Sequence, residues 1–301
     1  MRIFITGGTG LIGSALIKDL LMRGHDITVF TRNAKKASEK LGNQVIYSTS
    51  LDSFASLDEY DAVINLAGEP IAGRPWTKRQ KERLSNSRLR TTQKLSELIN
   101  KSNNPPKVFI SGSAVGYYGS QGDALLTEES EPYNEFTYRL CRQWEANALQ
   151  AATNTRVSIL RTGIVLSSIG GMLPKLSFPF RYGFGSVIGS GRQYISWIHI
   201  QDMVDAIIYL LETPDVEGIF NLTSPDSVTN REFSKALAKA MHRPCLFRIP
   251  SFFIKLFMGE ASTLIINGQR AIPKHLTDVG YKFRFENIER ALKNIMSGSN
   301  I

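Results

Sequence analysis

Apolar and polar positions change their period early in the chain. Residues 2–6 form a β-branched and aromatic run that ends at two glycines, and beyond them Leu16, Leu20 and Leu21 share one face of a helical pattern. The pattern predicts a strand, a tight turn and a helix. A second strand is expected at residues 27–31, because another β-branched run follows the glycine that ends the helix.

The alternation of strand and helix patterns continues to about residue 165. Further strands are expected at residues 44–48, 61–68, 107–111 and 157–161. Helical patterns separate them at residues 34–41, 77–100 and 136–152. This order predicts an α/β fold in which a doubly wound parallel sheet is covered by helices on both faces.

The pattern loosens in the second half of the chain. Residues 167–191 are rich in glycine and aromatic residues and predict a long loop or a small lobe. Asp202 is expected to cap a helix over residues 203–211, and a further strand is expected at residues 218–222. The remainder is expected to form a second lobe that closes over the sheet.

The glycines of the first turn fit two spacings, Gly8-x-Gly10-x-x-Gly13 and Gly7-x-x-Gly10-x-x-Gly13. A turn that merely needs residues without a Cβ would contain the same glycines. Here the motif follows a strand and opens a helix, which is the context of the dinucleotide fingerprint. Because the first N–H groups of a helix have no internal partner and lie at the positive end of its dipole, they suit a pyrophosphate.

The end of the second strand indicates which nucleotide is bound. Thr31 and Arg32 stand where the adenosine ribose is expected, and no acidic residue is present there to bind the free 2′-hydroxyl of NAD. The Arg32 guanidinium can instead pair with a 2′-phosphate. Lys35 and Lys36 fit a solvated helix start. We therefore predict NADP(H) in preference to NAD(H).

Ligands of such sheets gather beyond the carboxyl ends of the strands, so segments far apart in the sequence should converge on one crevice. The residues expected to bind the cofactor are Gly7, Thr9, Gly10, Leu11, Ile12, Gly13, Thr31, Arg32, Leu51, Leu66, Ala67, Gly68, Glu69, Ser111, Arg161 and Thr162. The expected domains are a nucleotide-binding domain over residues 1–165, completed by about residues 195–225, and a C-terminal substrate lobe of residues 166–194 and 226–301.

Composition narrows the partners and the compartment. The net charge is +9, but the basic residues are spread along the chain, so we expect no nucleic-acid partner. Two cysteines are too few for a disulfide framework and fit a reducing cytoplasm. The most apolar stretch, residues 249–258, contains Lys255 and is too short for a membrane span, so we expect no membrane partner. The four histidines show no spacing typical of metal ligands.

Several motifs together resemble a known family. They are the glycine turn, Asn65-Leu66-Ala67-Gly68-Glu69, Ser113-Ala114-Val115-Gly116-Tyr117-Tyr118-Gly119 and Trp197-Ile198-His199-Ile200-Gln201-Asp202. The chain is similar to the extended short-chain dehydrogenase/reductases, and within them to an atypical, YfcH-type NAD-dependent epimerase-like branch. The resemblance implies a Rossmann-type domain with a C-terminal substrate lobe, bound NADP(H), a small-molecule substrate and a homodimer.

The chain departs from the Tyr-x-x-x-Lys helix turn of typical members. Its Tyr position falls at Thr137 and its Lys position at Cys141, whereas a register shifted by one gives Tyr138 and Arg142. An arginine could lower the pKa of a phenol but lacks the compact ammonium of lysine. The candidate catalytic residues are therefore Ser113, where a substrate-binding hydroxyl would stand, and Tyr117 and Tyr138, which could supply a phenol.

Two functions fit these residues. The first is an NADP(H)-dependent oxidoreductase or epimerase-like enzyme that acts on a small polar, nucleotide-linked substrate, in which the cofactor supplies the hydride chemistry. The second is a sensor or scaffold that binds NADP(H) without turnover. Ser113 and the substrate lobe favour the enzyme, and the missing Tyr and Lys favour the sensor.

Overall fold

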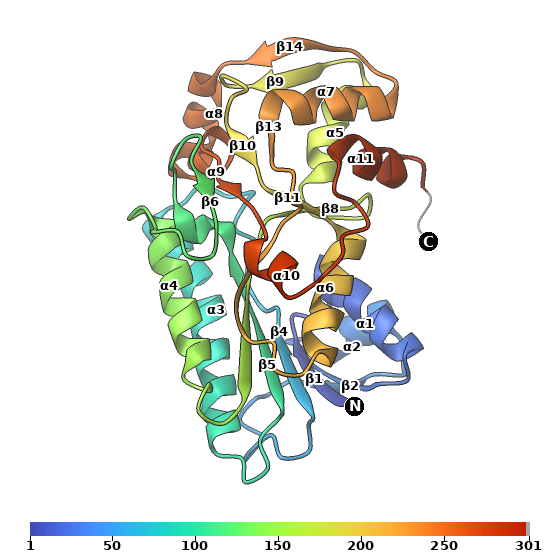
Figure 1. The fold of residues 1–301 in the computed structure, drawn as a ribbon, viewed down its shortest axis with the longest axis vertical. Helices are drawn as coiled ribbons and strands as arrows, with labels where there is room; N and C mark the ends of the chain where they lie inside the picture. Colours follow the sequence, from blue (N-terminus) through green and yellow to red (C-terminus); the bar gives the residue numbers. More distant parts are fainter. Residues whose placement is uncertain (299–301) are drawn as a thin grey trace.

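A seven-stranded parallel sheet forms the lower body of the molecule (Figure 1), in a computed structural model that describes residues 1–298. The strand order β12-β7-β5-β4-β1-β2-β3 is that of a doubly wound Rossmann-type sheet, which confirms the predicted fold class. The strands are β1 (Arg2–Thr6), β2 (Asp26–Phe30), β3 (Ile46–Ser48), β4 (Ala62–Asn65), β5 (Val108–Ala114), β7 (Arg156–Thr162) and β12 (Gly218–Leu222).

Helices cover both faces of this sheet (Figure 1). One face carries α1 (Leu11–Met22), α2 (Ala34–Leu41) and α6 (Ile200–Glu212), and the other carries α3 (Lys78–Asn100) and α4 (Phe136–Leu149). Because successive strand residues point to opposite faces, Ile3 and Ile5 of β1 join the core under α1 and α6, whereas Phe4 joins the core under α3 and α4.

The C-terminal lobe stands above the carboxyl ends of the strands (Figure 1). Its paired strands are β8 (Ile164–Leu166) with β11 (Trp197–His199), β9 (Gly185–Ile188) with β14 (Cys245–Ile249), and β10 (Tyr194–Ile195) with β13 (Val228–Thr229). Its helices are α5 (Leu173–Arg181), α7 (Asn230–Met241), α8 (Ser251–Met258), α9 (Thr263–Ile266) and α11 (Ile288–Met296). Trp197, Leu237 and Leu292 lie in its separate core.

Shorter elements link the two parts. Strand β6 (Leu125–Leu126) pairs with β15 (Arg270–Ala271), and α10 (Lys274–Asp278) packs beside β12. The 3₁₀ turns η1 (Val115–Tyr118) and η2 (Gly259–Ser262) follow β5 and α8.

Two expectations for the second half of the chain are wrong. Residues 167–191 are not a long loop, because they contain α5 and β9. Glycines and prolines suggested irregular structure, but burial of Leu173 and Phe180 in the lobe core outweighs them. Asp202 does not cap α6. It lies within the first turn, where its carboxylate accepts hydrogen bonds from the backbone N–H groups of Arg284 and Phe285.

His199 is the N-cap of α6 and connects the sheet to the last helix. Its Nδ1 accepts the backbone N–H of Gln201 at 3.0 Å, so in the neutral ring Nε2 carries the proton and faces Asn294 Oδ1 at 3.2 Å. The ring also stacks on Phe285 with centroids 3.9 Å apart. Burial lowers the pKa of His199 to about 4.

We predict that acid weakens the fold through His199. Its folded-state pKa lies below the unfolded value of about 6.5, so the unfolded chain binds the proton first and stability falls as the pH drops from about 6.5 toward 4. The expected loss is roughly 2–3 kcal/mol. Urea unfolding across this range should show a shallower decline for His199→Asn, which keeps a capping acceptor. An unchanged pH dependence would contradict this role of His199.

Candidate functional site

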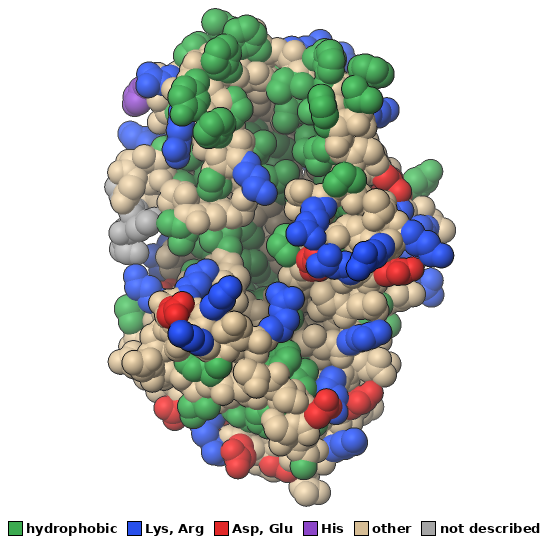
Figure 2. Space-filling model, turned by 180° about the vertical axis from the view of Figure 1, so that it is seen from behind, with side chains coloured by type: hydrophobic (Ala, Val, Ile, Leu, Met, Phe, Trp, Pro, Cys, Tyr) green, Lys and Arg blue, Asp and Glu red, His purple; other side chains and the backbone are tan. Residues whose placement is uncertain are grey.

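A cavity of about 550 Å³ lies between the carboxyl ends of the sheet strands and the C-terminal lobe. Figure 2 shows the molecule from behind, with a hollow down the middle of this face, apolar side chains in its depth and Lys and Arg side chains along its rim. The wall is formed by the first glycine turn, the ends of β4, β5 and β7, one face of α4, and α5, β10 and α9 from the lobe.

Steric limits explain two of the three motif glycines. Gly7 has φ +75°, and a Cβ on it would lie 2.4 Å from the carbonyl carbon and oxygen of Leu66. A Cβ on Gly13 would lie 2.4 Å from the carbonyl oxygen of Gly7. A Cβ on Gly10 would meet only that oxygen, at 3.1 Å. Gly10 therefore leaves open space at the cavity wall, which a bound group can use.

The N-terminus of α1 opens into this space. Gly10 is the N-cap, no side chain caps the helix, and its first turn contains no acidic residue. The N–H groups of Leu11, Ile12 and Gly13, which line the cavity, therefore have no acceptor within the helix. These donors and the positive end of the helix dipole fit a pyrophosphate.

The end of β2 supplies a cation near the mouth of the site. Arg32 is exposed and makes no hydrogen bond or ion pair with another residue of the described chain. The side chain of Asn33 next to it accepts the backbone N–H of Lys36 and starts α2. Lys40 donates to the carbonyl oxygen of Thr9 at 2.8 Å and so fastens the glycine turn to α2. Arg32 is thus left available for an anion.

The structure brings together half of the residues expected to bind the cofactor. Those that line the cavity are Gly7, Gly10, Leu11, Ile12, Gly13, Leu66, Gly68 and Thr162. Thr9, Thr31, Arg32, Ala67 and Glu69 lie at strand ends or turns beyond this wall. Leu51, Ser111 and Arg161 are buried and take no part in the wall, because their side chains pack or pair inside the protein.

A buried ion pair occupies the position expected for a cofactor contact from Arg161. Its Nε and Nη2 donate to the two carboxylate oxygens of Glu145 at 3.0 and 2.9 Å, and the Arg161 side chain is 2% exposed. Ser113 donates its hydroxyl proton to Glu145 Oε1 at 2.6 Å. Because a serine has one proton to donate, Ser113 faces the cavity as an acceptor.

The tyrosines expected to supply a phenol lie behind this pair. The Arg161 guanidinium carbon is 3.4 Å from the centroid of the Tyr117 ring, and the Tyr138 ring meets Tyr117 edge to face at 5.3 Å. Neither tyrosine lines the cavity. Thr137 and Cys141 face it instead, so the register without a Tyr or Lys is the one presented to a ligand.

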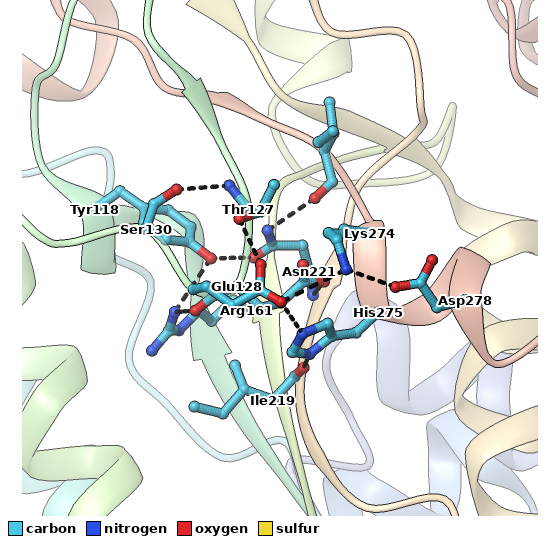
Figure 3. A network of polar contacts seen from close by, with 12 residues as sticks. Tyr118, Thr127, Glu128, Ser130, Arg161, Ile219, Asn221, Lys274, His275 and Asp278 are labelled. Atoms are coloured by element: carbon cyan, nitrogen blue, oxygen red, sulfur yellow. Dashed lines mark hydrogen bonds and ion pairs between the residues drawn. The ribbon is translucent and has the colours of Figure 1, made fainter.

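The same ion pair continues into a network that ties β12 to η1 and α10 (Figure 3). The hydroxyl of Tyr118 accepts from Arg161 at 3.1 Å and donates to Asn221 Oδ1 at 2.7 Å. Burial raises the pKa of Tyr118 to about 12. Glu128 accepts the backbone N–H of Asn221, and His275 contacts the carbonyl oxygen of Ile219. This network supports the site from behind.

The half of the cavity that faces the lobe is apolar. Its wall includes Ile71, Leu140, Trp144, Leu176, Ile188, Ile195, Leu264 and Ile265. Arg88 and Glu135 are the only charged residues of the described chain in the wall. Arg88 already donates to the carbonyl oxygens of Glu69 and Leu84, at 2.9 and 3.1 Å, and lies over the Trp144 ring. Sequence reasoning missed this wall because its residues are dispersed over irregular segments.

The surrounding chemistry offers few titrating groups. Burial raises the pKa of the Cys141 thiol to about 11. Within residues 1–298, no three His, Cys, Asp or Glu side chains lie close enough together to hold a metal ion.

Comparison with known proteins identifies the family. Residues 3–223 match the NAD dependent epimerase/dehydratase family, and residues 249–295 match a domain of unknown function, DUF1731. The Epimerase family protein YfhF of Bacillus subtilis is 35% identical, over 99% of this chain and 98% of that protein. The chain therefore belongs to the NAD dependent epimerase/dehydratase family, which confirms the resemblance.

Solved structures agree with this assignment. The human epimerase family protein SDR39U1 (isoform2) with NADPH superposes with a TM-score of 0.91 and 34% identity, over 100% of both chains. MoeE5 in complex with UDP-glucuronic acid and NAD superposes with a TM-score of 0.79 over 99% of both chains. At 19% identity, the second likeness shows the fold alone.

We predict different results for alanine at two of the motif glycines. Gly7→Ala should lower the thermal midpoint by several degrees, because its Cβ would overlap the Leu66 carbonyl at a positive φ. Gly10→Ala should leave the midpoint near that of the wild type but weaken NADPH binding at least tenfold, because its methyl group fills the space at the α1 N-terminus. Calorimetric scanning and NADPH titration measure the two effects. Equal NADPH affinity in Gly10→Ala would show that no ligand approaches this turn closely.

Proposed function

We propose that the protein is an NADP(H)-dependent oxidoreductase that transfers a hydride between the cofactor and a small molecule held in the lobe half of the cavity. The observation that carries the proposal is the uncapped N-terminus of α1, which opens beside Gly10 into a cavity that continues into a second, apolar compartment. The human relative at 34% identity was solved with NADPH, which supports the choice of cofactor.

The residues at the turn would hold the phosphates. The N–H groups of Leu11, Ile12 and Gly13 suit the pyrophosphate, and Arg32 suits a 2′-phosphate that NAD lacks. When bound, the nicotinamide ring would supply the hydride chemistry. Ser113 and Thr162, at the ends of β5 and β7, border the cavity between the turn and the lobe.

The chain's own residues would position the substrate and exclude water. Ser113 can accept a hydrogen bond from a substrate hydroxyl, because its own proton is held by Glu145. The buried ion pair of Glu145 with Arg161 fixes the Ser113 oxygen in place. Leu176 and Ile265 would shield the reacting atoms from water.

A sensor that binds NADP(H) without turnover is the second candidate. It is favoured by Thr137 and Cys141, which occupy the cavity face where typical relatives carry a tyrosine and a lysine. The enzyme is favoured by the apolar compartment, since a protein that only reads cofactor occupancy needs no second binding space.

We predict that Arg32 selects the phosphorylated cofactor. Arg32→Glu should weaken NADPH binding at least tenfold and leave NADH binding within about twofold, because only NADPH carries the 2′-phosphate. Lys35→Glu makes the same charge change on the neighbouring helix start and should have a much smaller effect. Titration of both cofactors at one ionic strength tests this. Equal losses for both substitutions would assign the preference to the general field of the basic rim.

A further inference from the structure

Resting on the proposed cofactor site, we propose that the hydride acceptor is an uncharged, largely apolar compound whose carbonyl group is conjugated with a carbon–carbon double bond. The lobe half of the cavity would hold this acceptor, and a nucleotide sugar would be excluded. Two observations carry the proposal: the polarity of the wall and the absence of a proton donor from it.

The polarity of the wall argues against a charged substrate. A nucleotide sugar brings a second diphosphate, which requires cations or free N–H donors in a site removed from water. Arg88 is the only Lys or Arg in the wall formed by the described residues, and both of its terminal nitrogens already donate to backbone carbonyls. Glu135 in the same wall would repel a phosphate. Leu176, Ile188 and Ile265 instead offer contact area to an apolar molecule.

The hydroxyl and thiol groups of the wall are poor acids. Ser113 has committed its proton to Glu145, and Cys141 keeps its proton up to a pKa of about 11. Thr137 carries an aliphatic hydroxyl. An isolated ketone that gains a hydride concentrates a full negative charge on its oxygen and needs a matched acid beside it. A conjugated acceptor spreads that charge over its π system, so it needs no acid from the protein.

The reaction balances without any further reactant. The acceptor gains the hydride and its two electrons at the β carbon, where a C–H bond forms as the C=C π bond breaks. The enolate that results takes one proton from water at its α carbon, which restores the carbonyl group. NADPH is oxidised to NADP⁺, and the product is the saturated carbonyl compound.

A matched pair of ligands tests the proposal. Benzylideneacetone contains the conjugated double bond, and benzylacetone is its saturated counterpart of nearly the same shape. Calorimetric titration into protein saturated with NADP⁺ should show that both bind and that UDP-glucose does not. With NADPH, only benzylideneacetone should be reduced, as followed by loss of NADPH absorbance and by identification of the benzylacetone product.

A pair of substitutions on α5 locates the binding. Leu176→Lys places a charge in the wall and should weaken binding of both ketones at least tenfold, with NADP⁺ affinity unchanged. Phe178→Lys, on an exposed position of the same helix outside the wall, should change neither. Binding of UDP-glucose in place of the ketones, reduction of benzylacetone, or an unaffected Leu176→Lys variant would each overturn the proposal. Failure to bind NADP⁺ at all would instead overturn the proposed function.

A second inference rests on a different part of the surface, the outer end of the C-terminal lobe. Helix α5, strand β14, helix α8 and the turn after α5 carry an aromatic end, defined as the side chains of Phe178, Tyr182, Phe184, Leu246, Phe247, Phe252, Phe253, Leu256 and Phe257. Each of them is between 50% and 79% exposed, and α8 has no buried residue. Figure 2 shows apolar side chains gathered at this end of the molecule.

The charge of the aromatic end indicates what covers it. Residues 172–192 and 242–258, which form it, contain six lysines and arginines and no aspartate or glutamate. Contact with a second copy through this face would bring two such sets of cations together. We infer that the aromatic end lies on an anionic lipid bilayer, with aromatic rings at the headgroup level and the cations facing lipid phosphates.

Such a contact requires no spanning segment. None of the helices within residues 1–298 is long and apolar enough to cross a bilayer. The sequence argument against a membrane partner considered spans only, whereas an interfacial helix needs a single apolar face.

Vesicle flotation tests this surface. At about 0.15 M salt, the protein should float with phosphatidylcholine vesicles that contain phosphatidylglycerol and much less with phosphatidylcholine alone. Replacing both Phe252 and Phe257 by serine should reduce flotation at least fivefold by removing apolar contact area. Met22→Ser, an equally exposed position on α1, should not. Unchanged flotation of the double variant would overturn the inference, as would a wild-type dimer that the double substitution dissociates in sedimentation velocity.

Discussion

The close approach of two backbones at the end of the sheet is the constraint on which the site depends. Gly7 adopts a positive φ with its Cα against the Leu66 carbonyl, and Gly13 packs its Cα against the carbonyl oxygen of Gly7. Any side chain at these two positions would push the turn away from β4 or from α1. Because the turn is held against β4, the N-terminus of α1 opens directly beside the strand ends. Gly10, which meets no such obstacle, is where that N-terminus is left accessible.

The buried ion pair fixes the neighbouring strand ends. Glu145 of α4 uses both carboxylate oxygens on Arg161 of β7 and also accepts the proton of Ser113 on β5. Desolvating two charges is offset only by such complete pairing, so the relative positions of α4, β5 and β7 are tightly specified. Thr137 and Cys141 lie on the same α4, so their positions in the cavity wall follow from this arrangement. The arrangement that orients Ser113 thereby removes its ability to donate a proton.

Sequence reasoning succeeded where a local pattern and the tertiary structure agree. The order of strands and helices, and the glycine turn between β1 and α1, follow from period and turn chemistry alone. It failed where a long-range contact decides. Arg161 follows a strand end and looked like a cofactor ligand, but a buried acid on α4 claims it. Asp202 looked like a helix cap, yet backbone N–H groups some eighty residues later bind it.

The apolar wall and the loss of the usual acid are consistent with each other. A lysine at the position of Cys141 would carry its charge into a compartment lined by Leu140, Trp144 and Ile265, where desolvation disfavours the charged form. A thiol with a pKa of about 11 stays neutral there at pH 7, as does the hydroxyl of Thr137. A phenol would need such a cation to ionise near neutral pH. Residues that avoid charge in an apolar compartment therefore also abandon acid catalysis, which restricts hydride transfer to acceptors that can delocalise the charge they gain.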